Sequence, residues 1–248
     1  MRSRRNFIKV SGMATLGFMG LHHWVSSPAQ AAAHTSNGAG YGPLLPDPAG
    51  ILNLPKGFSY KILSTKGEQM DDGLFLPGAP DGMAAFKGKK GRVIVVRNHE
   101  LSPDSFKNGA FGETNQLLEK VGPDKFYDYG KKAIPGLGGT STFIYDEKSG
   151  KIEKQWLSLA GTVRNCAGGP TPWNSWLTCE ESTIKAGAYE GKIEKDHGYV
   201  FEVPATDKIE LALPLPIKAM GRFNHEAVAV DPRTGIVYLT EDRGDSLI

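Results

Sequence analysis

The segment Trp173-Asn-Ser-Trp-Leu-Thr-Cys-Glu-Glu181 is a short apolar run, rich in strand-forming residues, that ends in two acids. The same arrangement recurs in Arg92-Val-Ile-Val-Val-Arg-Asn-His-Glu100 and in Gly235-Ile-Val-Tyr-Leu-Thr-Glu-Asp242. Runs of this length with many β-branched and aromatic residues are typical of strands. The sequence therefore contains an internal repeat in which a strand leads into acidic residues.

Other strands between these segments give the repeat its period. Residues 140–146 and 197–203 are two such strands, and each is followed by a Lys-Ile-Glu strand that begins at Lys151 or Lys208. These two lysines are 57 residues apart, and the phenylalanines of the preceding strands are 58 apart. Short strands repeated at this spacing predict an all-β fold of the β-propeller type. A two-sheet sandwich would explain the strands but not the period.

Three other segments have a predicted local structure. Residues 114–120 are the one plausible helical insertion of this β-rich sequence. Residues 168–173, with two glycines and two prolines, predict a bulged turn that enters a strand. Residues 81–86 predict a turn followed by a core strand, with Asp81 as a minor candidate for a metal ligand.

The composition describes a folded chain with many turns. The 248 residues include 31 Gly and 16 Pro, and the formal net charge is +2. The first 31 residues hold four cations and no acid, so the remainder carries 25 basic and 27 acidic residues. A mature chain with this slightly negative charge has no electrostatic reason to bind nucleic acid, which excludes that class of partner.

The N-terminus has the layout of an export signal. Ser3-Arg-Arg-Asn-Phe-Ile-Lys9 precedes a mildly apolar stretch, and Ala29-Gln-Ala31 offers a cleavage site between small residues. This layout matches a twin-arginine signal peptide. It predicts the twin-arginine export machinery as a partner and a periplasmic or extracellular location. The apolar stretch of about twelve residues is shorter than the ~20 that a spanning helix needs, so stable membrane insertion is not expected.

We therefore expect a signal peptide over residues 1–31, a linker over residues 32–50 and a partial propeller over residues 51–248. The 217 residues after position 31 supply four or five blades at about 40–60 residues each. A propeller closes only when its last blade meets its first, and the repeat predicts a new strand where the sequence stops. The expected propeller is therefore incomplete, as in a truncated sequence.

The acidic strand ends form a candidate metal site. Propeller strands near the axis bring their ends to a shared channel, so acids that are far apart in the sequence converge there. These acids are Glu100, Glu180, Glu181, Glu241 and Asp242. Clustered carboxylates repel one another unless cations neutralise them, and carboxylate oxygens suit Ca²⁺. Any single one of them is more simply a solvated strand end, but their recurrence at equivalent positions favours a metal site.

Two histidines and two cysteines lie close to these acids. Asn98-His99-Glu100 has a counterpart in Asn224-His225-Glu226. The simpler role for both histidines is a hydrogen-bonded core imidazole that orients the neighbouring Glu, with direct metal ligation as the alternative. Cys166 and Cys179 are 13 residues apart, a spacing that suggests a disulfide in an exported protein. Cys179 also occupies an acidic strand end, where a thiolate would be a strong metal ligand, so both roles stay open.

Longer motifs carry a resemblance to a known family. They are Asp81-Gly-Met-Ala-Ala-Phe86, Arg97-Asn-His-Glu100, the block from Asn165 to Glu181, the block from Gly221 to Asp231, and Tyr238-Leu-Thr-Glu-Asp-Arg243. Together with the twin-arginine signal, they resemble the PhoX family of exported alkaline phosphatases, over nearly all residues from 45 onward. The resemblance implies a six-bladed β-propeller that hydrolyses small phosphate monoesters at an axial cluster of Ca²⁺ and Fe³⁺.

Transferred motif by motif, the resemblance implies roles for individual residues. Cys179 and Glu226 would be iron ligands and catalytic residues. The calcium-side ligands would come from Glu100, Glu180, Glu181, Glu241 and Asp242. Arg243 is a catalytic candidate that would clamp phosphate oxygens, with a surface ion pair as the alternative. The family's later Arg-Pro-Glu-Asp segment has no match before Ile248, so little activity is expected from this chain alone.

Two other functions stay open. A calcium-dependent, lactonase-like propeller hydrolase would also use axial carboxylates but would not need Cys179. A non-catalytic, calcium-stabilised binding propeller would need no reactive group at all. The sequence has no Gly-x-Ser-x-Gly elbow and no His-Glu-x-x-His helix, so it gives no support to serine-hydrolase or zincin chemistry. We expect a monomer that acts on small phosphoesters.

Overall fold

The computed structural model describes residues 40–246, which divide into two compact units after Lys61. The described part of the first unit holds a small antiparallel sheet of β1 (Leu44–Leu45) and β2 (Leu54–Pro55). The predicted signal peptide, residues 1–31, lies outside the described residues, as does the first part of the predicted linker. The division between the units falls later than the linker end predicted at residue 50.

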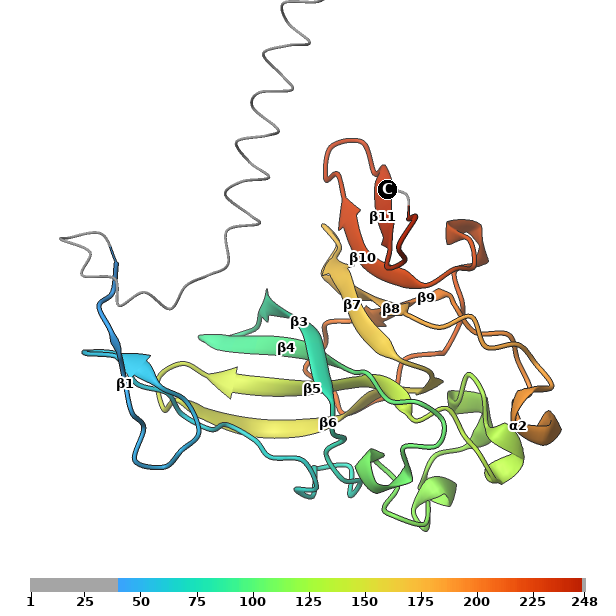
Figure 1. The fold of residues 1–248 in the computed structure, drawn as a ribbon, viewed down its shortest axis with the longest axis horizontal. Coiled ribbons are helices and arrows are strands. Elements are labelled where there is room, and N and C mark those ends of the chain that lie inside the picture. The colour runs from blue at the N-terminus through green and yellow to red at the C-terminus, as the bar shows by residue number, and fades with distance from the viewer. Residues whose placement is uncertain (1–39, 247–248) are drawn as a thin grey trace, which may run out of the picture. The chain divides into compact units, whose positions relative to one another are not determined.

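The second unit begins with a four-stranded antiparallel meander (Figure 1). Its strands follow one another in chain order: β3 (Pro80–Lys87), β4 (Arg92–His99), β5 (Gly138–Asp146) and β6 (Lys151–Thr162). A four-stranded meander of this kind is one propeller blade.

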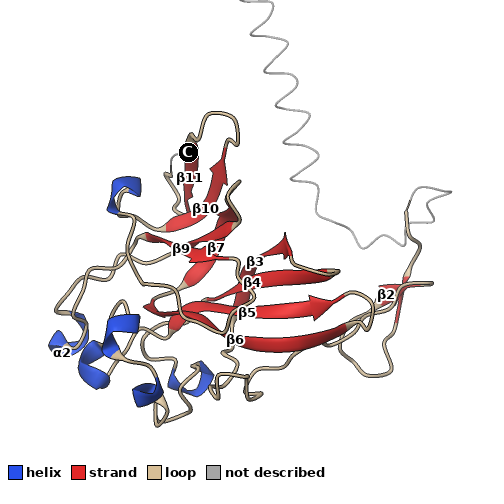
Figure 2. Cartoon of the chain, turned by 180° about the vertical axis from the view of Figure 1, so that it is seen from behind, coloured by secondary structure: helices blue, strands red, loops and turns tan. Residues whose placement is uncertain are grey.

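Two smaller sheets repeat the start of this meander. β7 (Asn165–Pro170), β8 (Ser175–Glu180) and β9 (Val200–Pro204) form a three-stranded antiparallel sheet, and β10 (His225–Val230) pairs with β11 (Val237–Glu241). The first strands of successive sheets lie together, because β7 contacts both β3 and β10. Figure 2 shows that strands dominate this unit and that its helices are single turns. The all-β class and the blade arrangement predicted from the repeat are confirmed.

The helical turns lie outside the sheets. They are η1 (Phe106–Asn108), η2 (Leu118–Lys120), η3 (Pro123–Lys125), η4 (Gly130–Lys132), α2 (Ala188–Gly191) and η5 (Lys218–Met220). The predicted helical insertion over residues 114–120 is therefore wrong, since only its last three residues form a 3₁₀ turn. In the part of the chain that the structure describes, no helix is long and apolar enough to cross a membrane.

The predicted strand at Lys208 is also wrong. After β9 the chain leaves the second sheet, and Ala212 donates a backbone hydrogen bond to Ser158 in the first. It returns to β9 only at an isolated bridge between Pro216 and Phe201. Because Pro214 and Pro216 have no N–H group to donate, this segment offers few hydrogen bonds to a ladder with β9. The predicted turn over residues 168–173 begins inside β7, and the turn itself follows Pro170.

The first and second sheets share one hydrophobic core. Trp156 from the first sheet and Phe201 from the second are both fully buried in it. Asn98, at the end of β4, joins the sheets by donating to the carbonyl oxygens of Cys166 and Ala167. Its own oxygen accepts hydrogen bonds from side chains of β8. This buried amide holds the two sheets in register near the ends of their inner strands.

Candidate metal centre

A β-bulge occupies the same position in all three sheets. Near the start of each first strand, two residues lie opposite a single residue of the second strand. The paired residues are Asp81 with Gly82, Cys166 with Ala167, and Glu226 with Ala227. A bulge bends its strand and redirects the local side chains. Gly82 has no side chain here because a Cβ atom would lie 2.8 Å from the Cα atom of Ala167.

The end of each second strand supplies a carboxylate next to the bulge. Each sheet thus has one pair of side chains, formed by the first bulge residue and the acid that follows the second strand. The three pairs are Asp81 with Glu100, Cys166 with Glu181, and Glu226 with Asp242. They occupy equivalent positions because the three sheets repeat the same antiparallel register.

Three members of these pairs meet in space. The thiol sulfur of Cys166 and carboxylate oxygens of Glu181 and Glu226 all lie within 4.8 Å of one another. One thiol and two carboxylates form a donor set that suits a transition metal, and further carboxylate oxygens nearby suit Ca²⁺. The chemistry of this group therefore fits a bound cation. We call Cys166, Glu181 and Glu226 the axial cluster.

The protonation of the axial cluster reflects the burial of its members. Burial raises the pKa of the Cys166 thiol, and the nearby charge of Glu226 raises it further. Burial also raises the pKa of Glu226, and the charges of Glu181 and Asp242 add to that rise. The Cys166 thiol lies 3.3 Å from the backbone carbonyl oxygen of His225, to which it donates. A cation that binds here must therefore displace the thiol proton, so binding becomes easier as the pH rises.

Arg164 lies between the carboxylates of the first two sheets. Its Nη2 atom is 2.7 Å from an oxygen of Glu100 and 2.6 Å from an oxygen of Glu181. Burial raises the pKa of Glu100, while the charge of Arg164 acts in the opposite direction. Arg164 was not among the residues predicted from the sequence, although its place just before Asn165-Cys166 was a usable signal.

A model of the family described as "Alkaline phosphatase PhoX" matches residues 39–146 and 146–248. The chain belongs to this family. The family resemblance inferred from the motifs is thus confirmed.

Among solved structures, this chain is similar to Pseudomonas fluorescens PhoX in complex with vanadate, a transition state analogue. The two sequences are 19% identical, and the TM-score is 0.48. The match covers 77% of this chain and 46% of the other, so the chain spans less than half the length of that protein. No curated protein matches this sequence.

Glu180 lies apart from the axial cluster. Its side chain is fully buried, and its oxygens accept hydrogen bonds from three backbone N–H groups and from Nδ1 of His197. Consecutive residues of a strand point to opposite faces, which separates Glu180 from Glu181. The oxygens of Glu180 are filled in this way, and Glu180 is not among the three residues whose donor atoms meet in the axial cluster.

Cys179 also lies apart from the axial cluster. It stands in β8 opposite the bulge and is buried among apolar side chains that include Leu177, Val200 and Val228. Burial raises the pKa of this thiol as well. Cys166 and Cys179 are both free cysteines. The structure thus places Cys166, and not Cys179, beside the two carboxylates.

The two histidines near the site have different surroundings. His99 is buried, with Nδ1 2.8 Å from the carbonyl oxygen of Gly78 and Nε2 2.8 Å from Oγ of Ser141. Burial lowers its pKa to about 3, so the imidazole is neutral. His99 is thus a hydrogen-bonded core imidazole, as expected, and its expected orientation of Glu100 stays a prediction. His225 is buried against the ring of Phe223, with ring centroids 3.6 Å apart.

The remaining predicted residues lie at the end of the third sheet. Glu241 is the last residue of β11 and pairs with His225, and the backbone N–H of Asp242 donates to Asn224. The charge of Asp242 contributes to the raised pKa of Glu226, which places it near the axial cluster. Arg243 is exposed, and its assignment as a phosphate clamp stays a prediction.

Proposed function

We propose that this chain carries part of a metal-dependent active site that hydrolyses phosphate monoesters. The observation that carries the proposal is the convergence of Cys166, Glu181 and Glu226 from equivalent positions of two sheets. Membership of the alkaline phosphatase PhoX family supports the same reaction. Small phosphoesters are the proposed substrates.

The axial cluster would hold the cations of this site. The Cys166 thiol and the Glu226 carboxylate suit Fe³⁺, while Glu100, Glu181 and Asp242 offer oxygens of the kind that Ca²⁺ prefers. The bulge position of Asp81 makes it a further oxygen donor in the first sheet. Bound cations would stabilise the negative charge on the phosphoryl oxygens as the transition state forms.

Arg164 would position the acids and bind substrate. Its guanidinium links Glu100 to Glu181, so carboxylates of two different sheets are held on one charged group. The Arg164 side chain is 40% exposed and can donate further hydrogen bonds from its fork. A phosphate oxygen is a suitable acceptor, because charge-assisted bonds from arginine to phosphate are short and strong.

Export is a separate part of the proposal. The Arg4-Arg5 pair, the apolar stretch and the Ala29-Gln-Ala31 site support passage through the twin-arginine machinery to the periplasm or the cell exterior. This route carries folded proteins, so the Cys166 thiol could bind its metal before the protein enters an oxidising compartment. Both cysteines are buried and free, which agrees with that order of events.

Hydrolysis of p-nitrophenyl phosphate tests the proposed reaction. Because the chain carries only part of the site, we expect weak turnover, which is lost with a chelator, restored by Ca²⁺ and iron together, and strongly reduced by Glu226→Gln. Glu190→Gln is the matched control, because this carboxylate has a side chain that is 88% exposed and lies outside the cluster. Turnover that resists chelation, or that Glu226→Gln leaves intact, would overturn the proposal.

A further inference from the structure

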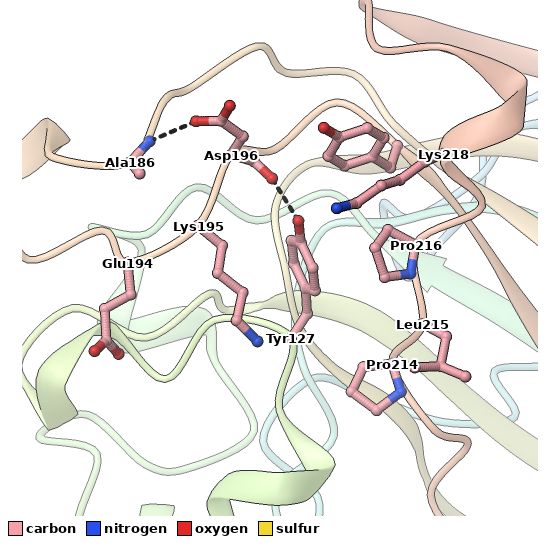
Figure 3. A pocket seen from close by; sticks show the side chains of 10 residues that line it. Tyr127, Ala186, Glu194, Lys195, Asp196, Pro214, Leu215, Pro216 and Lys218 are labelled. Carbon is pink, nitrogen blue, oxygen red and sulfur yellow. Dashed lines mark hydrogen bonds between the residues drawn. The ribbon is translucent and has the colours of Figure 1, made fainter.

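A pocket lies between the segment that leads into β5 and the segment that joins β9 to β10. It has a volume of about 520 Å³. Figure 3 shows Tyr127, Lys195 and Lys218 around it, with Pro214, Leu215 and Pro216 along one wall. None of these residues belongs to the axial cluster.

The pocket lining carries two lysines, Lys195 and Lys218, and two acids, Glu194 and Asp196. Within the described residues, neither Lys195 nor Lys218 forms an ion pair with a carboxylate. The two acids of the lining are engaged elsewhere: Asp196 accepts a hydrogen bond of 2.9 Å from the N–H of Ala186, and Glu194 accepts one of 3.1 Å from the N–H of Lys131. Figure 3 shows the Asp196 carboxylate turned toward Ala186 and the Glu194 carboxylate turned away from Tyr127. The two ammonium groups thus lie beside the pocket while the two carboxylates of its lining are turned toward backbone N–H groups.

The walls of the pocket are aromatic and apolar. The Tyr127 ring is fixed by a hydrogen bond of 2.5 Å from its hydroxyl to the carbonyl oxygen of Asp196. The ammonium of Lys195 lies 5.1 Å from the centre of that ring, within range of a cation–π contact. Tyr199 adds a second ring, and Leu215 is 68% exposed at the rim. An exposed leucine beside two rings and two prolines offers a surface for a flat apolar group.

We propose that this lysine pocket binds a small organic anion with an aromatic ring, whose charge meets Lys195 and Lys218 while its ring packs against Tyr127 and Tyr199. The pocket opens at the same end of the second sheet as the axial cluster. Tyr199 directly precedes β9, and Glu181 directly follows β8, its antiparallel neighbour. The binding claim goes beyond the proposed hydrolysis and does not require it, because no residue of the axial cluster lines the pocket.

Calorimetric titration of the full chain with 2-naphthalenesulfonate tests the pocket. This probe is an aromatic anion that a phosphatase cannot hydrolyse, so binding and catalysis are measured apart. We expect saturable binding, with and without a chelator, that weakens as salt rises because the two lysines are exposed. Neutral 2-naphthol should bind more weakly because it has the ring but no charge. Inorganic phosphate should also bind more weakly because it has the charge but no ring.

The double substitution Lys195→Gln and Lys218→Gln should weaken probe binding by about tenfold, as two surface charge interactions are removed. Lys148→Gln, an exposed lysine in the β5–β6 turn, is the matched control and should leave the affinity unchanged. Glu226→Gln should also leave it unchanged. No binding to the wild-type chain, or equal affinity in the double variant, would overturn the inference. Loss of probe binding in Glu226→Gln would show that the probe occupies the axial cluster instead.

Discussion

Glu180 and Glu181 are consecutive residues in two opposite environments. Glu180 is fully buried, and its oxygens are filled by three backbone N–H groups and the imidazole of His197. Glu181 lies on the other face, where it meets one arginine and shares the axial cluster with a thiol and a second carboxylate. The hydrogen-bond donors to Glu180 are part of the folded chain. Glu181 instead lies beside a thiol and a carboxylate, which are themselves potential ligands of a cation.

The difference between Glu180 and Glu181 shows how a structural acid can be distinguished from a candidate metal ligand. Beside Glu180, His197 also contacts Asp128 at 3.3 Å, and all three side chains are buried. Burial lowers the pKa of His197, but the charge of Glu180 and the hydrogen bonds to both acids outweigh it and raise the pKa to about 9. The buried acids therefore have an internal cation at neutral pH. Among residues 40–246, the axial cluster has no such buried cation, and its ion pair joins Glu181 to the partly exposed Arg164.

The largest expected effect is on stability, and it separates the two neighbours. Glu180→Gln removes the charge that His197 needs, and breaking a buried pair of this kind costs about 3–5 kcal/mol of unfolding free energy. Glu181→Gln should cost about 1 kcal/mol or less, since its partner Arg164 is partly exposed. Urea denaturation of both variants in the presence of a chelator measures the difference. Equal losses would show that the two acids do not have different roles.

The pH dependence of stability should follow His197. Its pKa is raised from 6.5 to about 9 in the folded state, so the stabilisation is complete below pH 6.5 and is lost as the pH rises through 9. At 1.36 kcal/mol per unit, the contribution is on the order of 3 kcal/mol. His197→Gln should flatten this part of the profile, which denaturation midpoints between pH 6 and 10 would reveal. A wild-type profile that is already flat there would contradict a charged His197.

A smaller stability effect is expected at Arg164, together with a change in activity. Arg164→Gln should alter the unfolding free energy by about 1 kcal/mol or less, because the side chain is 40% exposed. It should lower kcat/KM for p-nitrophenyl phosphate by about tenfold or more if the guanidinium meets the phosphate. Arg243→Gln is the comparison, and we expect a smaller loss there. A larger loss of kcat/KM in Arg243→Gln would show that Arg243, the residue suggested by the family motif, is the one that binds the phosphate.

Much of the fold followed from local patterns in the sequence. The apolar runs before Glu100, Glu181 and Asp242 predicted the second strands, and their repeat predicted that these acids would occupy equivalent positions. The strand expected at Lys208 does not form, and the chain after it reaches the first sheet through the hydrogen bond from Ala212 to Ser158. Intrinsic strand propensity near Lys208 could not show where the following segment would pair.

The choice between neighbouring ligands could not be made from the sequence. A shift of one residue in register turns a side chain to the opposite face, and a bulge produces such a shift locally. The bulge at Cys166 brings this thiol to Glu181 and Glu226 and leaves Cys179 in the core. Alternation alone cannot locate a bulge, so the sequence pointed to Cys179 as the metal ligand, whereas the thiol that lies with the two carboxylates is that of Cys166.

The metal content of two cysteine variants tests the central claim most directly. Cys166→Ala and Cys179→Ala would be purified as full chains, checked for folding by circular dichroism, and analysed for iron and calcium by mass spectrometry. We predict that Cys166→Ala loses iron while Cys179→Ala keeps it, because only the Cys166 sulfur lies with the carboxylates of Glu181 and Glu226. Retention of iron by folded Cys166→Ala, with loss from folded Cys179→Ala, would contradict the account.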